Sequence, residues 1–197
     1  MDFSYQEIIA VIALLMGLVT TTTYITSILC GKTKPHLYSW IVYSILTAIA
    51  FFAQVHDHGG PGTWITGITA AQCIMIAFLS IKYGEKNKTT SDKMALITSL
   101  SAIIPWLFTD DPLLSVILIS IIDAVATYPS IRKSWHKPHE ERLLSWNLAA
   151  FKNTLSIFAL TNMTVTTVLY VATTVVVNCT LIGVCLWRRR VLKNNGI

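Results

Sequence analysis

Seven apolar runs, each long enough to cross a lipid bilayer, constrain this chain more than any other feature. They cover residues 5–29, 38–55, 62–83, 93–109, 112–133, 143–161 and 164–187. A helix needs about 20 mostly apolar residues to cross a hydrocarbon core about 30 Å thick, and strands of a membrane barrel would alternate instead. Charged residues make up only 13% of the 197 positions, against roughly 25% in soluble domains. We therefore predict an all-α integral membrane protein with seven transmembrane helices, and we exclude a soluble enzyme and a nucleic-acid partner.

The basic residues predict the orientation of these helices. Every lysine and arginine except Lys152 lies in residues 32–34, 82–93, 132–142 or 188–193. A seven-helix arrangement puts all four segments on one side, while the other side carries acidic residues such as Asp57 and no basic residue. Because basic loops stay in the cytoplasm, we expect the plasma (inner) membrane, with the N-terminus outside and the C-terminus in the cytoplasm. The basic tail would contact membrane lipids.

The chain also contains an internal repeat. Thr23-Tyr24-Ile25, Lys34-Pro35-His36 and Ser39-Trp40 recur as Thr127-Tyr128-Pro129, Lys137-Pro138-His139 and Ser145-Trp146. This pattern predicts a first three-helix repeat over residues 1–84, a linker with the fourth helix over 85–110, and a second three-helix repeat over 111–197. An odd linker helix gives both copies the same topology, as in transporters built from parallel repeats.

This three-plus-one-plus-three plan resembles the SWEET and PQ-loop transporter superfamily, and also small bacterial heptahelical membrane proteins. The most specific likeness is the stretch Tyr128-Pro129-Ser130 followed by a basic loop. It is similar to the PQ-loop pattern, although Ser130 stands where that family has glutamine. The resemblance implies two parallel three-helix bundles and a solute site near the bilayer midplane, with Tyr24, Tyr128 and Pro129 as gate or hinge residues.

Two charged residues fall deep inside apolar runs, away from their ends. Asp123 lies deep in the fifth run and Lys152 at comparable depth in the sixth. Because such residues are costly in lipid, we expect the two side chains to pair with each other. The pair would serve as a proton relay or a solute anchor, or alternatively as a salt bridge that fixes one helix to the next. A retinal-binding lysine is disfavoured, because rhodopsins carry that lysine on the last helix.

Uncharged polar residues complete the predicted site. Gln72 and Asn178 occupy matched positions on the third and seventh helices, where the resemblance implies contact with solute from both sides. An amide offers donors and an acceptor, so hydroxyl-rich or zwitterionic solutes would suit it, with interhelical hydrogen bonding as the alternative. Asn153 would line the same cavity beside Lys152.

Two tryptophans belong to the repeat. Trp40 and Trp146 open the second and sixth helices at the cytoplasmic side. Tryptophan at a helix end is commonly an interface anchor, and the alternative is a ring that stacks on the solute at a gate.

No enzymatic motif or cofactor-binding fingerprint is present in the sequence, so we expect no enzyme and no cofactor. His56-Asp57-His58 is interpreted as a solvated turn rather than a metal site. We predict a transporter or facilitator for a small polar solute such as a sugar, amino acid or vitamin, with proton coupling and a homo-oligomer left open. The alternative is a non-transporting heptahelical receptor.

Overall fold

In a computed structural model, the chain is helical throughout the part that is described: residues 4–31, 35, 37–84, 94, 97, 101, 111–136, 138–140 and 143–194. The elements are α1 (Tyr5–Leu29), α2 (Leu37–His56), α3 (Pro61–Tyr83), α6 (Pro112–His136), the 3₁₀ turn η1 (Pro138–Glu140), α7 (Leu143–Phe158) and α8 (Val165–Asn194). Of the predicted fourth helix, only Met94, Ile97 and Ser101 are among the described residues, and all three are helical. The remainder of that prediction lies outside them.

Four of these helices, α1, α2, α3 and α8, are long and apolar enough to cross a membrane. The apolar part of α6 is shorter, over Pro112–Val125, and α7 has 16 residues. Large apolar side chains cover the outer surface, among them Leu15, Phe78 and Ile81. A water-soluble monomer seldom exposes so much apolar side chain, and this exterior is compatible with a lipid environment.

Helix ends follow local sequence signals. Ser4 and Glu7 form a capping box at the start of α1, and Pro61 opens α3 directly after Gly60. The carboxylate of Asp111 accepts a hydrogen bond from the Leu113 amide at 2.9 Å, capping α6. The Ser4 and Asp111 side chains accept from amide groups that a helix start leaves without partners, and Pro61 has no amide N–H that needs a partner.

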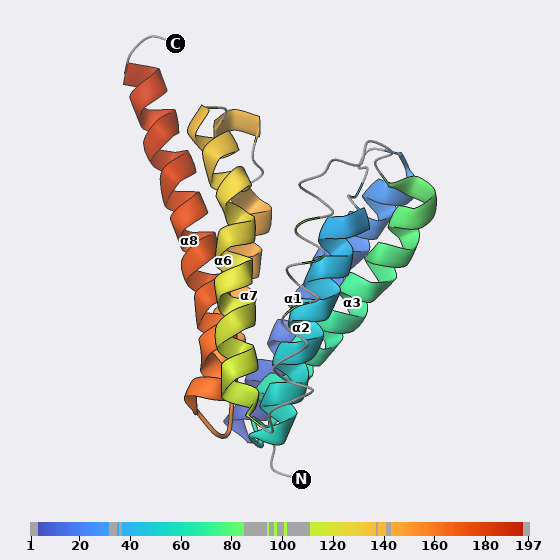
Figure 1. The fold of residues 1–197 in the computed structure, drawn as a ribbon. Helices are drawn as coiled ribbons and strands as arrows, with labels where there is room; N and C mark the ends of the chain where they lie inside the picture. The colour runs from blue at the N-terminus through green and yellow to red at the C-terminus, as the bar shows by residue number, and fades with distance from the viewer. Residues whose placement is uncertain are drawn as a thin grey trace.

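Each half of the described chain is a three-helix bundle with the same internal order. In the first, α3 packs against both α1 and α2, and in the second, α8 packs against both α6 and α7. The third helix of each triplet therefore lies between the other two. Both triplets run in the same directions, so that α1 and α6 start at the same end of the molecule (Figure 1). This arrangement is what a parallel repeat requires.

The packing between the bundles is also related by exchange of the halves. Helix α1 contacts α7 and α2 contacts α6, while α3 contacts α7 and α2 contacts α8. If α1 is exchanged with α6, α2 with α7 and α3 with α8, the same set of contacts results. One apolar cluster joins α2, α6 and α8 around Leu46 and Ile119. The other joins α1, α3 and the end of α7 around Ala13 and Ile65, and the same exchange relates the two clusters.

The two bundles meet at one end and diverge toward the other. The end where they meet holds the α2–α3 turn and the α7–α8 turn, and the ends of α3 and α8 lie far from it (Figure 1). Two predicted boundaries need correction here. Helix α7 ends at Phe158 rather than residue 161, because the Ala159 carbonyl accepts from Gly62 of the other bundle at 2.9 Å. Helix α8 continues to Asn194, since Arg188 and Arg189 bond to the α6–η1 segment.

Candidate solute site

A cavity of about 210 Å³, lined mainly by residues that carry a polar group, lies between the bundles. Its walls come from α2 and α3 on one side and from α7 and α8 on the other. The lining residues are Thr47, Ile65, Thr66, Thr69, Ala149, Lys152, Asn153, Ser156, Tyr170, Val171, Thr174 and Asn178. Most carry a hydroxyl, amide or amine, although the helices that supply them are apolar elsewhere. The cavity thus gathers hydrogen-bonding groups from both bundles.

Lys152 supplies the charge of this cavity. Its Nζ donates a hydrogen bond to Thr69 Oγ1 of α3 at 2.9 Å, across the bundle interface. Its carbon stem packs beside Gly17 of α1, where a Cβ would lie 3.5 Å from Lys152 Cδ. Gly17 therefore lies beside the stem of Lys152, with room for a Cβ at ordinary contact distance.

Asp123 lies directly behind the cavity wall. It is buried in α6, and its Oδ2 accepts a hydrogen bond at 3.5 Å from Thr174, which lines the cavity. Among the described residues no ion pair joins Asp123 to Lys152. The expected direct pair is therefore not observed, because each charged group bonds to a threonine on a different helix.

The predicted amides separate in the structure. Asn178 is buried and lines the cavity together with Asn153. Gln72 is not part of the lining. Its buried Nε2 finds no partner among the described residues and faces Gly17, where a Cβ would lie 3.9 Å away. Gln72 thus lies outside the lining that contains Asn178, and both residues as solute contacts stay a prediction.

Tyr24, Trp40 and Trp146 are not among the residues that line the cavity. Tyr24 and Trp40 stack with ring centroids 5.3 Å apart, and Tyr43 meets Trp40 edge-on at 5.9 Å. This cluster joins the end of α1 to the start of α2. Trp146 is partly buried near the start of α7. Tyr128 and Pro129 lie within α6, which continues to His136, and their side chains are outside the described set.

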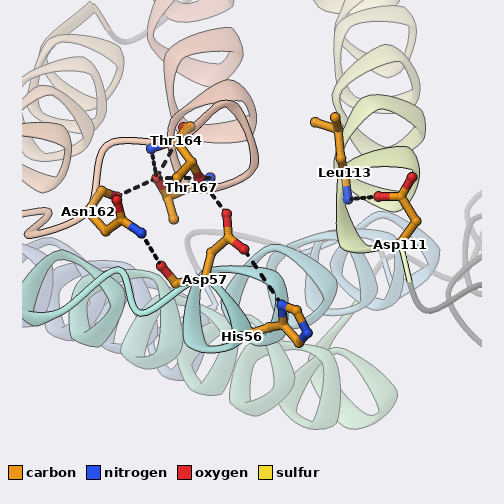
Figure 2. A network of polar contacts seen from close by, with 7 residues as sticks. All are labelled: His56, Asp57, Asp111, Leu113, Asn162, Thr164 and Thr167. Carbon is orange, nitrogen blue, oxygen red and sulfur yellow. Dashed lines mark hydrogen bonds and ion pairs between the residues drawn. The ribbon is translucent and has the colours of Figure 1, made fainter.

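The end where the bundles meet is closed by a polar clasp (Figure 2). We use the name clasp for Asp57, Asn162, Thr164 and Thr167. The Thr164 hydroxyl donates to Asp57 Oδ2, and Asn162 Nδ2 donates to the Asp57 carbonyl at 2.8 Å. Thr164 and Thr167 exchange side-chain hydrogen bonds with each other's amides, at 3.0 and 3.2 Å, at the start of α8. Residues 57 and 58 form a turn, as interpreted from the sequence, and Asp57 in addition bonds to the other half of the chain.

The electrostatics of the clasp favour the ionised carboxylate. The Thr164 hydrogen bond is the main cause that holds the pKa of Asp57 below its ordinary value of 3.8. Desolvation by burial opposes this shift, and Thr166 and His56 add smaller contributions that lower the pKa. The start of α8 contributes as well, because a helix N-terminus attracts negative charge. His56 Nδ1 lies 3.6 Å from Asp57 Oδ1.

Two further hydrogen bonds to backbone carbonyls join the bundles at the same end. Thr161 N donates to the Gly59 carbonyl at 2.9 Å, and Gln54 Nε2 in α2 donates to the Thr167 carbonyl at 2.8 Å. Gly60 has φ +70°, and a Cβ there would clash with the Thr161 side chain. The two turns approach this closely because they are built from glycine and small polar residues.

Several site residues were not singled out from the sequence. Thr66, Thr69 and Thr174 line the cavity, yet threonine is common throughout these helices and commonly bonds to its own helix backbone. Gln54, which is almost fully buried, is a polar residue within an apolar run of the sequence. That pattern could have indicated its contact with the other bundle more clearly than the threonines indicate the cavity.

No family model, curated protein or solved structure matches this chain. The likeness to the SWEET and PQ-loop superfamily thus stays an expectation based on the residues quoted above, and the functional argument depends on the site itself.

Proposed function

We propose that this chain is an integral membrane carrier for a small polar solute, with the N-terminus outside and the C-terminus in the cytoplasm. The observation that supports this most directly is the cavity between two bundles that pack in the same way. Solute sites between structural repeats are typical of secondary transporters. Helices α2, α3, α7 and α8 supply the cavity walls in our proposal, so motion of one bundle against the other changes the site as a whole.

The asymmetry between the two ends suggests how access alternates. In the proposed orientation the clasp is on the outer side, and the bundles diverge toward the cytoplasm. The cavity then communicates with the cytoplasm until the diverging ends close and the clasp opens. Breaking a few hydrogen bonds in a clasp is a modest cost, since each contributes about 0.5–1.5 kcal/mol net. Asp123, behind Thr174, is the group we propose for proton coupling.

The test is solute flux in vesicles that contain the purified full chain. We expect uptake or exchange of at least one compound from a panel of sugars, amino acids, organic acids and vitamins, with and without a proton gradient. Asn178→Ala removes an amide from the cavity wall and should reduce that flux at least tenfold. Thr180→Ala is the matched control, because Thr180 lies two positions further along α8 with an exposed side chain bonded to its own helix at 2.8 Å.

One observation favours a receptor as the second candidate. His139, Arg189, Arg190 and Lys193 surround an open hollow near the end of α8, and Arg189 fixes η1 by donating twice to the Pro138 carbonyl at 2.8 and 3.0 Å. An exposed basic surface of this kind suits a cytoplasmic partner. Absence of flux for the whole panel would overturn the carrier and favour this alternative.

A further inference from the structure

We propose that the cavity between the bundles binds a small solute with a single negative charge, a monocarboxylate of about ten non-hydrogen atoms or fewer, through Lys152. This inference deepens the proposed carrier function and names the solute class of the same site. It is carried by the geometry around Lys152 and by the composition of the cavity wall.

The first step concerns charge. Lys152 is the only Lys, Arg, Asp or Glu among the lining residues, and in the described part of the chain no carboxylate lies within ion-pair distance of its Nζ. The ammonium has one assigned bond, to the neutral Thr69 hydroxyl. A cation held in a low-dielectric interior gains much from an anionic partner, and an uncompensated one is strongly unfavourable. A solute anion would supply that partner.

The second step concerns the donors around the ammonium. Thr66, Ser156 and Asn153 line the same cavity, whereas the Thr69 hydroxyl already donates to the Ile65 carbonyl at 2.7 Å. Hydroxyl and amide groups donate to carboxylate oxygens, and bonds to a charged acceptor are about twice as strong as neutral ones. Ser156 Oγ donates to the Gly62 carbonyl at 3.2 Å, a weak bond that a carboxylate would replace at little cost. The wall thus offers several donors for two carboxylate oxygens.

The third step concerns size and charge number. A volume of about 210 Å³ corresponds to about seven waters at roughly 30 Å³ each, which suits a solute of on the order of ten non-hydrogen atoms. One cation balances one negative charge. A phosphate group carries about −1.5 to −2 at neutral pH and would leave excess negative charge in the cavity, so a monoanion fits better than a phosphate ester.

The experiment measures binding without requiring transport. Purified full-length protein in detergent is titrated with acetate, butyrate and benzoate, each beside its neutral amide, and with inorganic phosphate. The readout is the ligand-induced rise in Tm, which reports binding to the folded state. We expect at least one carboxylate to bind at least tenfold more tightly than its amide and than phosphate. Amides that bind as well as their acids, or no carboxylate-dependent rise, would overturn the inference.

Variants assign the effect to Lys152. Lys152→Met keeps an aliphatic stem of similar length and should weaken carboxylate binding about tenfold to a hundredfold, since a charge-assisted hydrogen bond contributes about 1.5–3 kcal/mol. Lys152→Arg retains the charge and should retain most of the binding. Lys82→Met is the matched control, because Lys82 is an exposed lysine of α3 above the Tyr83 ring. Equal binding by the wild type and Lys152→Met, with both proteins folded, would contradict the assignment.

The two proposals fail separately. Carboxylate binding without flux in vesicles would overturn the carrier and retain the anion site. Flux of a neutral solute that Lys152→Met leaves unchanged would retain the carrier and overturn the anion site.

Discussion

Asp57 joins the two bundles through its side chain and its backbone, and its carboxylate makes the clasp sensitive to acid. Its pKa is lowered in the folded protein, so folding favours the ionised form. The stabilisation is complete above the ordinary pKa of 3.8 and is lost as the pH falls through the lowered folded value. We expect Asp57→Asn to lower Tm by roughly 1–4 °C at pH 7, and this difference should disappear in strong acid.

Asp111 provides the control for that prediction. Its carboxylate caps α6 by accepting from Leu113 within the same segment and takes no part in the clasp (Figure 2). Asparagine caps helices about as well as aspartate, so Asp111→Asn should leave Tm nearly unchanged at pH 7. A deficit of Asp57→Asn that stayed constant from pH 7 to pH 3 would show that the carboxylate charge has no part in the clasp.

Gly31 and Gly60 differ in how closely other atoms surround them. Gly31 and Gly60 both have φ +70°, but a Cβ would meet nothing within 4 Å at Gly31 and would clash with Thr161 at Gly60. Gly31→Ala should therefore show only the left-handed backbone cost, about 1–2 kcal/mol. Gly60→Ala should lower Tm by several degrees more, because the backbone of Gly60 (φ +70°, ψ −147°) is one that only glycine adopts readily and because its Cβ would clash with Thr161. Equal Tm values for the two variants in thermal unfolding would contradict the close approach at Gly60.

At the scale of the elements, local signals predicted most helix boundaries and contacts between bundles changed the others. The start of α3 at Pro61 and the tight turn before Val165 follow from residues within a few positions. The end of α7 does not, because the Ala159 carbonyl bonds to Gly62, almost a hundred residues earlier. Contacts between the bundles also decide which residues line the cavity. Gln72 and Asn178 match in the repeat, yet only Asn178 reaches the lining, since helix rotation depends on packing that no local pattern records.

The approach of α1 to α7 gives a prediction at this scale. Gly17 lies beside the Lys152 stem, and a Cβ there makes an ordinary contact at 3.5 Å. Gly17→Ala should therefore keep the fold and the solute affinity. Gly17→Leu should push α1 away from α7 and displace Lys152, with at least a tenfold loss of carboxylate affinity in the Tm titration. Unchanged affinity in Gly17→Leu would mean that α1 does not position the cation.

At the scale of the whole molecule, the sequence predicts the two bundles but not which of the two ends is closed. The internal repeat predicted two bundles of the same topology, and the described helices pack in two triplets of the same order. Which end is closed could not be predicted, because the sequences of the two turns resemble ordinary polar loops. The closure depends on Asp57 meeting Thr164 and on Gly60 meeting Thr161 across the halves, and the two residues of each pair are about a hundred positions apart along the chain.

A reversible cross-link at the clasp tests the proposed cycle of the whole molecule. All four native cysteines are free, so they are first replaced by serine or alanine, and Asp57 and Thr164, which are in direct contact, are then changed to cysteine. Oxidation should stop solute flux in vesicles, because the clasp can no longer open, and reduction should restore it. The single variants Asp57→Cys and Thr164→Cys, treated in the same way, are the controls.

In the cross-linked protein, a third cysteine at Thr69 in the cavity wall should still react with a polar thiol reagent from the side where α8 ends, and not from the side of the clasp. Undiminished flux after complete cross-linking would exclude alternating access through this end.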